Sequence, residues 1–290
     1  MIFAMIIVDN GTTLAFLKHV ENAGSSYWYH SPFSSLMTNP RLISSRNNPQ
    51  FKRWVSLLES QGSQTHQQCL VSGTKLRKEL LQNSSMAPCE LLLPPSYEII
   101  NKFESQATYI SLTKALFNEL DVFGTKEPLL VCPTPSIPLF DLTQPPLGLE
   151  ILCPISDPGN LGALLRSCRV FGVRTVILLR ESVYPFHPKV IRASSGAAFV
   201  QSLSQGCSVG ELQKPELLKW IIPLDMRGDD IATLDWPQHI RLLIGEEGLG
   251  IPSLPYSRRF SIKQIHSAIP LNATVAGSIA LHAYRQQHPD

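Results

Sequence analysis

Three turns in the C-terminal half of the chain are rich in glycine or asparagine and stand at the ends of predicted strands. They are residues 157–162, 245–250 and 271–276. A turn that opens a helix presents backbone N–H groups with no partner inside the helix, and such groups bind anions, phosphate among them. Glycines let the backbone approach a ligand closely. The three turns therefore indicate a ligand site in which backbone groups take part.

The first turn has the residues that start a helix. Asp157 can cap it, Pro158 suits its first position and Gly159 lets the turn close tightly. Arg166 follows about two helical turns later. A guanidinium does not normally lose its proton, but its fork can grip a phosphate and stabilise a developing negative charge. The alternative is a well-capped helix that carries one exposed arginine, and the spacing alone favours it.

The other two turns add possible ligand contacts. The second lacks the Lys-Ser/Thr end of a phosphate loop, which argues against a nucleoside triphosphatase. Its adjacent carboxylates, Glu246 and Glu247, could attract a positively charged ligand or remain exposed. In the third turn, Asn272 can cap the helix that follows, and it can serve a ligand as well.

In this order and at these spacings, the three turns resemble the SpoU (TrmH-like) family of RNA 2′-O-ribose methyltransferases. Asn160, Gly162 and Arg166 match the family pattern Asn-x-Gly-x-x-x-Arg. Residues 245–250 match Gly-x-Glu-x-x-Gly, with Glu247 at the acidic position. The resemblance implies methyl transfer from S-adenosyl-L-methionine (SAM) to a ribose 2′-OH.

The third motif matches in part. Ile262, Leu271 and Asn272 fall at the family spacing. Lys263 and Gln264 replace the family's Pro-Met, and Pro270 replaces a serine that the family keeps beside the catalytic arginine. These departures bear on the rate of the reaction. They leave SAM binding plausible, because backbone groups hold much of the cofactor in the family.

Carried onto this sequence, the resemblance implies three sets of site residues. The catalytic set is Arg166, Glu247 and Asn272. The cofactor set is Leu224, Gly245, Ile262 and Leu271. The RNA-binding set is Asn160, Arg166, Arg192 and Lys75, with Arg192 as a further phosphate contact. His187 is expected to be a loop or packing residue rather than a base.

The pattern of apolar residues predicts an α/β protein. Near-continuous apolar runs at 149–153, 175–179, 220–224, 241–244 and 260–262 are typical of parallel strands covered on both faces. The clearest helices are 161–171 and 275–284. Upstream, short strands alternate with helices, and one helix starts at Asn47 or Asn48 with Pro49 in its first turn.

The resemblance also implies the domains and the assembly. We expect an extension of unknown role over residues 1–43 and an L30e-like RNA-binding domain over 44–131. A proline-rich linker over 132–148 and a SpoU methyltransferase domain over 149–290 complete the chain. The family's SPOUT-type parallel sheet is tied into a deep trefoil knot, and its members form homodimers with the active site near the interface.

The composition limits the kinds of partner, bound group and compartment that we expect. The net charge of the 290 residues is only +2, so an RNA surface must be local; candidate clusters are residues 52–78 and 166–192. The six cysteines form no zinc pattern, and the sequence predicts neither a metal site nor a membrane span. The apolar start favours a strand or a disordered start over a signal peptide. We expect a soluble protein in the reducing cytoplasm.

Structured RNA is the expected substrate, and the separate L30e-like domain favours ribosomal RNA over transfer RNA. A transfer RNA 2′-O-methyltransferase is one alternative. A second is a non-enzymatic RNA-binding or ribosome-assembly protein on the same fold, motivated by Lys263, Gln264 and Pro270. A third is a metabolic α/β enzyme with a nucleotide cofactor, for which the sequence has no fingerprint.

Overall fold

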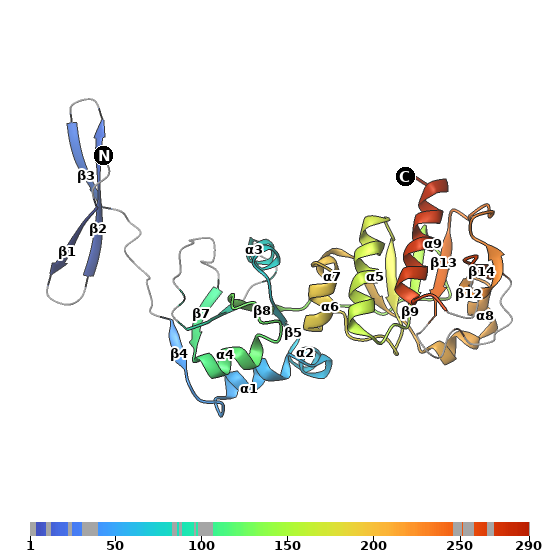
Figure 1. Ribbon diagram of the computed structural model, residues 1–290, viewed down its shortest axis with the longest axis horizontal. Helices are drawn as coiled ribbons and strands as arrows, with labels where there is room; N and C mark the ends of the chain where they lie inside the picture. Colours follow the sequence, from blue (N-terminus) through green and yellow to red (C-terminus); the bar gives the residue numbers. More distant parts are fainter. Residues whose placement is uncertain are drawn as a thin grey trace. The chain divides into compact units, whose positions relative to one another are not determined.

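The computed structural model describes residues 4–9, 13–22, 25–30, 40–82, 86, 89–95, 97, 107–245, 251, 258–265 and 270–289. The chain divides into two compact units, Met1–Arg41 and Leu42–Asp290 (Figure 1). The first unit is an antiparallel sheet in the order β1-β2-β3. Its strands are β1 (Ala4–Asp9), β2 (Thr13–Asn22) and β3 (Ser25–His30). The sequence suggested a strand at the start of the chain, but it did not predict this sheet.

The second unit begins with a mixed five-stranded sheet in the order β4-β7-β6-β8-β5. Its strands are β4 (Arg41–Ile43), β5 (Gln68–Val71), β6 (Cys89–Leu93), β7 (Ala107–Leu112) and β8 (Leu129–Pro133). The helices between them are α1 (Pro49–Ser56), α2 (Ser60–His66), α3 (Thr74–Gln82) and α4 (Lys114–Leu120). The small α/β arrangement expected before the linker is confirmed.

Helix α1 starts where the sequence predicts. The side chain of Asn48 accepts a hydrogen bond from the Gln50 amide at 2.9 Å, and Pro49 occupies the first helical position. The buried Phe51 and Trp54 then pack the helix against one face of the mixed sheet. Proline fits there because the first amides of a helix have no intrahelical acceptor.

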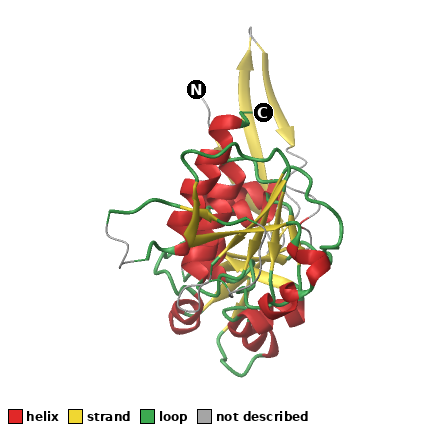
Figure 2. Ribbon diagram, turned by 90° about the vertical axis from the view of Figure 1, so that its right-hand side faces the viewer, coloured by secondary structure: helices red, strands yellow, loops and turns green. Residues whose placement is uncertain are grey.

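The rest of the second unit is built on a six-stranded sheet in the order β11-β10-β9-β13-β12-β14, with every pair parallel (Figure 2). Its strands are β9 (Leu149–Cys153), β10 (Thr175–Leu178), β11 (Leu203–Gln205), β12 (Ile221–Asp230), β13 (Ile240–Ile244) and β14 (Phe260–Ser261). The helices are α5 (Pro158–Val170), α6 (Pro188–Ala193), α7 (Ala197–Val200), η3 (Val209–Gln213), α8 (Pro215–Leu218) and α9 (Ala273–Gln287). The predicted α/β class and parallel sheet are confirmed.

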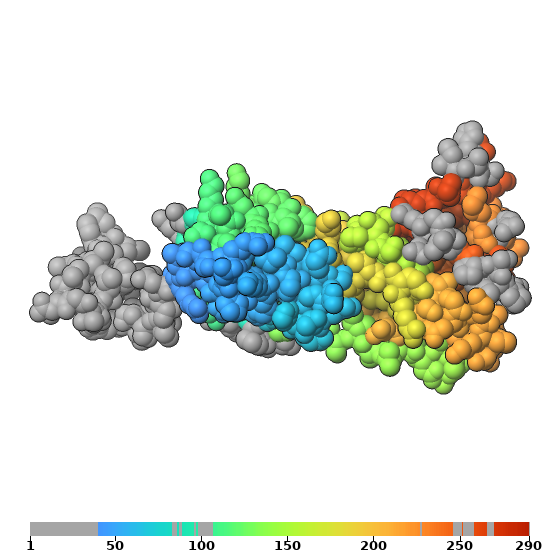
Figure 3. Space-filling model, turned by 90° about the horizontal axis from the view of Figure 1, so that it is seen from below, coloured from blue at the N-terminus to red at the C-terminus, as the bar shows by residue number. Residues whose placement is uncertain are grey.

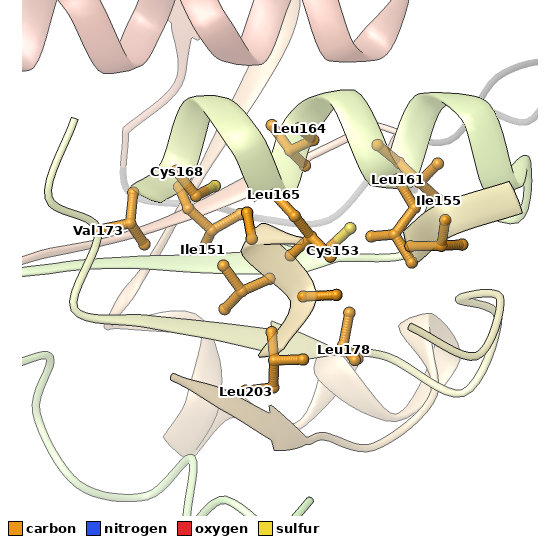
Figure 4. Packing of buried hydrophobic residues seen from close by; sticks show 14 of the residues in the cluster. Ile151, Cys153, Ile155, Leu161, Leu164, Leu165, Cys168, Val173, Leu178 and Leu203 are labelled. Atoms are coloured by element: carbon orange, nitrogen blue, oxygen red, sulfur yellow. The ribbon is translucent and has the colours of Figure 1, made fainter. Parts of the chain in front are cut away.

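Both faces of the parallel sheet are covered, as near-continuous apolar strands require. Ile151 and Cys153 of β9 pack under α5, beside Leu161 and Leu165 (Figure 4). Leu152, between them, points to the opposite face and joins the cluster that contains η3 and α8. Side chains alternate between the faces of a strand, so one buried strand serves two apolar layers.

A buried arginine ties the segment before the parallel sheet to the sheet itself. Arg241 of β13 is 0% exposed and donates from Nε to the carboxylate of Glu150 at 2.8 Å. It also donates to the carbonyl oxygens of Leu142 at 2.9 Å and Gln144 at 3.1 Å. Residues 142 and 144 lie in the proline-rich stretch expected to be a linker, and these bonds fix their backbone. The apolar run 241–244 did not suggest a buried charge.

Two further expectations concern the course of the chain. Residues 246–250, 252–257 and 266–269 lie outside the described part of the chain, and the knot that the resemblance implies stays a prediction. The part of the chain that the structure describes contains no helix long and apolar enough to cross a membrane. The described residues also hold no cluster of side chains suited to a metal ion.

Candidate active site

The first and third turns open helices as the sequence predicts. In α5, the Asp157 carboxylate accepts from the Asn160 amide at 2.8 Å, and Pro158 fills the first helical position. In α9, Asn272 Oδ1 accepts from the amides of Thr274 at 2.9 Å and Val275 at 3.2 Å. Both caps satisfy amides that would otherwise lack a partner.

These two helix starts are joined to each other. Asn272 Nδ2 donates to Asn160 Oδ1 at 3.2 Å, across 112 residues of sequence. Thr274 Oγ1 donates to the Asn160 backbone oxygen at 2.9 Å. The structure therefore brings Asn160 and Asn272, which the sequence placed in separate motifs, into one polar junction. The bridging role of Thr274 was not foreseen, although the residue lies within the matched motif.

Gly162 allows a neighbouring helix to approach α5 closely. A Cβ at this position would lie 2.5 Å from the Ala193 Cβ and 2.8 Å from the Val190 backbone oxygen of α6. Any side chain here would push α6 away. The glycine of the first motif is thus explained by packing between helices.

Arg166 lies on α5, six residues after Asn160. That separation corresponds to about 9 Å along the helix axis. The side chain is exposed, and its guanidinium makes no hydrogen bond or ion pair with any residue that the structure describes. Its donors are therefore available to an anion.

Strand register brings three of the four expected cofactor residues together. Leu224 of β12 is level with Ile244 of β13 and with Phe260 of β14. Gly245 directly follows Ile244, and Ile262 comes two residues after Phe260. Neighbouring parallel strands thus carry Leu224, Gly245 and Ile262 to one edge of the sheet, where α/β proteins commonly bind ligands.

Helix α9 and its first turn lie near the same edge. A Cβ at Gly277 would lie 2.9 Å from Ile244 Cδ1, so α9 packs against the end of β13. Leu271, the fourth expected cofactor residue, directly precedes the Asn272 cap and is 37% exposed. An exposed apolar side chain at this place is available to a ligand.

A pocket of about 430 Å³ lies beside Ile262. It is lined by Met226, Asp230, Ser261, Ile262, Lys263 and Gln264. Lys263 and Gln264, which stand where the family has Pro-Met, therefore face this pocket. Its apolar side chains and the Asp230 carboxylate suit an apolar and a cationic part of a ligand, and Lys263 suits a carboxylate; SAM carries all three kinds of group.

The remaining expected RNA contacts have different surroundings. Lys75 is exposed on α3. Arg192 is exposed at the end of α6, and its guanidinium carbon lies 4.5 Å from the centre of the Phe123 ring, a cation–π distance. Glu247 lies outside the described residues. Arg192 and Lys75 are thus accessible, but they do not belong to the junction of Asn160 with Asn272.

The first basic cluster, residues 52–78, is not one exposed patch. Arg77 is buried and donates to the Pro128 carbonyl at 3.0 Å. Arg53 is half-buried and pairs with Glu90 at 2.6 Å. These two arginines hold the mixed sheet together, so only the exposed lysines of the cluster can meet RNA.

His187 caps α6 and accepts a hydrogen bond at Nδ1 from the Lys189 amide at 3.1 Å. Burial lowers the pKa of His187 below its ordinary value, and nearby Lys189 adds to this while Glu59 opposes it. A neutral imidazole is what the cap requires. The expectation that His187 has a packing role is confirmed.

Comparison with known proteins agrees with this geometry. Residues 150–282 match the model of the SpoU rRNA Methylase family. The chain is 38% identical over 251 residues to "Ribosomal RNA small subunit methyltransferase G 2" of Syntrophobacter fumaroxidans, covering 84% of this chain and 49% of that protein. It is 32% identical over 152 residues to "23S rRNA (guanosine-2′-O-)-methyltransferase RlmB" of Coxiella burnetii, covering 50% and 60%. The chain thus spans about half of the length of these relatives.

A solved structure has the same fold. The SpoU methyltransferase AviRb from Streptomyces viridochromogenes, in complex with the cofactor AdoMet, superposes with a TM-score of 0.69 at 24% identity. The superposition covers 84% of this chain and 99% of AviRb. Together with the matched motifs and the joined helix starts, these similarities place residues 150–282 in the SpoU (TrmH-like) family of RNA methyltransferases, with an α/β domain before this segment.

Proposed function

We propose that this protein transfers a methyl group from SAM to a ribose 2′-OH of ribosomal RNA. One observation carries the proposal: the Asn160–Asn272 junction joins two helix starts at one end of α5, while the same helix presents Arg166, whose guanidinium has no partner among the described residues. This arrangement offers an anion-binding group next to a polar site at the sheet edge.

The protein contributes to the reaction mainly by positioning the reactants. Displacement at a methyl carbon needs an in-line approach, so orientation of the attacking oxygen contributes much of the acceleration. Arg166 holds the phosphate next to the target ribose with its fork, and stabilises charge that develops on the 2′-oxygen. Asn272 shapes the site from the start of α9, and Glu247 is assigned the same task from the second motif.

Leu224, Gly245, Ile262 and Leu271 would hold the cofactor, whose sulfonium supplies the methyl group. Support comes from the register that aligns three of them and from the pocket beside Ile262. The AviRb structure, which contains AdoMet, supports the same cofactor here. Leu224 and Ile262 provide apolar contact area, and Gly245 lets the backbone come close.

Ribosomal RNA is the proposed substrate. Relatives named for methylation of 23S rRNA support it, and so does the α/β domain that precedes the parallel sheet. We assign residues 44–131 to an L30e-like RNA-binding domain, 132–148 to a linker and 149–290 to the methyltransferase domain. Lys75 and Arg192 then serve as phosphate contacts outside the reacting centre. A cytoplasmic location fits a substrate of this kind.

We also propose that the protein works as a homodimer that meets through α9. Val275 and Ile279 are 47% and 39% exposed. They lie four residues apart on one face of α9, so they form an apolar stripe, which does not include Leu271 because that residue precedes the helix. A second copy of the stripe would cover it symmetrically.

Calorimetry with SAM and S-adenosylhomocysteine tests the cofactor assignment. Binding of both at micromolar strength supports the proposal, and Ile262→Asp should abolish it, while the exposed control Arg174→Ala should leave it unchanged. Absence of binding to the folded wild-type dimer, both alone and with ribosomal RNA added, would instead favour an RNA-binding protein without methyl transfer.

A further inference from the structure

A second pocket lies where the mixed sheet's helix α3 meets α5 and α7. Its volume is about 350 Å³. The residues that matter for its chemistry are Leu76, Glu79, Leu80, Arg166, Arg169 and Phe199. Figure 3 shows the blue surface of the first part of the second unit next to the yellow and green surface of the part that follows. The pocket thus combines residues that are about ninety positions apart in the sequence.

One wall of the pocket carries two arginines that suit an anion. Arg166 and Arg169 are three residues apart on α5, so their side chains leave the helix on the same face. Both are exposed, and neither makes a hydrogen bond or ion pair with the described residues. Two free guanidiniums side by side suit the phosphates of a nucleic-acid backbone.

The other surfaces of the pocket are apolar. Leu80 is 6% exposed at its floor, and Leu76 and Phe199 are half-buried. At the rim, Val170 and Val200 are 73% and 59% exposed, which is unusual for large apolar side chains next to free cations. Apolar side chains next to two arginines that can bind phosphate suit the flat face of a nucleobase.

Glu79 distinguishes this pocket from a plain phosphate site. Its carboxylate is exposed on α3, lines the pocket, and forms no ion pair with Arg166 or Arg169 in the described structure. A carboxylate repels phosphate, but it accepts hydrogen bonds from the amino group of a base. Guanine, adenine and cytosine carry such an amino donor at the pairing edge, whereas uracil has no amino group.

We propose that this pocket holds one unpaired nucleotide of the RNA, adjacent to the one that is methylated. Arg166 and Arg169 grip its phosphates, the apolar walls hold the base, and Glu79 selects an amino-bearing base over uracil. The proposal rests on the proposed function, because it makes Arg166 the link between this nucleotide and the reacting ribose. Glu79 and Arg169 become specificity residues of the enzyme.

Fluorescence anisotropy of labelled pentaribonucleotides tests the pocket with the full-length protein at one fixed salt concentration. The probes are UUGUU, UUCUU, UUAUU and UUUUU, with GMP as competitor. We expect each of the first three to bind about tenfold more tightly than UUUUU, and Glu79→Ala to remove the difference. Arg169→Ala should weaken all of them by about tenfold, while Lys214→Ala, which removes an exposed cation outside the pocket and outside both basic clusters, should have no effect.

Three results would overturn the proposal: a base preference that survives Glu79→Ala, equal behaviour of Arg169→Ala and Lys214→Ala, or GMP that binds as tightly as a pentamer. The last would indicate a site for a free nucleotide. Methyl transfer is assayed separately on ribosomal RNA. If the wild type methylates ribosomal RNA but shows no preference among the pentamers, the nucleotide pocket is wrong and the proposed function stands. If a Glu79-dependent preference is found without any methyl transfer, the proposed function is wrong and the pocket stands.

Discussion

Asn272 and Asn160 are hydrogen-bonded at 3.2 Å, although 112 residues separate them in the chain. Asn160 lies in the first turn of α5 and Asn272 caps α9, so the bond fixes the two helices against each other where both begin. The same asparagine thereby caps its own helix and positions the neighbouring one. The site is therefore formed where the N-termini of two helices meet, and not by a single loop.

Replacement of Asn272 can separate its two roles. Asn272→Ala removes the cap and the bond to Asn160, and should lower the free energy of unfolding by about 1 kcal/mol. Asn272→Asp keeps the cap acceptor and suits the positive end of the helix, so stability should change by less than about 0.5 kcal/mol. Urea unfolding measures both. Methyl transfer should fall in both variants, and full activity in Asn272→Asp would show that the bond to Asn160 is dispensable.

Gly162→Ala tests the close contact of α5 with α6. The added methyl would meet the Ala193 Cβ and the Val190 backbone oxygen, neither of which can rotate away. Overpacking of this kind costs about 1–3 kcal/mol, despite the better helix propensity of alanine. Gly210→Ala is the control, because its Cβ would meet only Ser208 Oγ at 3.9 Å. Equal stability of the two variants in urea would contradict the packing account.

Much of the parallel sheet could be predicted because its strands are buried on both faces. The apolar runs at 149–153, 175–179 and 241–244 correspond to β9, β10 and β13, with boundaries shifted by at most one residue. Capping residues located α5 and α9 for a similarly local reason. The Asn160–Asn272 bond could not be derived from local pattern, because it depends on how distant helices cross.

The Arg241–Glu150 pair should be essential to the stability of the parallel sheet. Arg241→Ala leaves the Glu150 carboxylate buried without its partner, and such changes cost about 3–5 kcal/mol. Arg241→Met combined with Glu150→Leu should recover most of the loss, because it removes both charges. Thermal and urea unfolding measure the effect, with the exposed Arg174→Ala as control. A single variant as stable as the control would contradict the account.

Stability should decline at mildly acidic pH through His187. Burial lowers its pKa in the folded protein below the ordinary value of 6.5, so the unfolded chain binds the proton more readily. Its contribution is therefore complete above about pH 6.5 and is lost as the pH falls through the folded pKa. His187→Asn keeps an acceptor for the cap and should flatten this part of the profile. An identical pH profile in wild type and variant would refute the assignment.

Other features could not be predicted from the pattern of residues in the sequence. The antiparallel strands β1 to β3 lie in a stretch that lacks a clear alternation, and their pairing is a matter of backbone register. Arg77 reads as a surface cation in the sequence but is buried. The pocket between α3 and α5 needs two domains to be present together, so neither Glu79 nor Arg169 stood out as a specificity residue.

The most direct test of the central claim follows labelled methyl transfer from SAM to ribosomal RNA, with the product mapped as 2′-O-methylribose by its resistance to alkaline cleavage. We predict transfer by the wild type and by Lys214→Ala, a loss of about a hundredfold or more in Arg166→Ala, and an intermediate rate in Arg166→Lys, which keeps the charge but not the fork. Full transfer by Arg166→Ala would contradict the assignment of Arg166 as the residue that grips the phosphate and stabilises charge at the reacting 2′-oxygen.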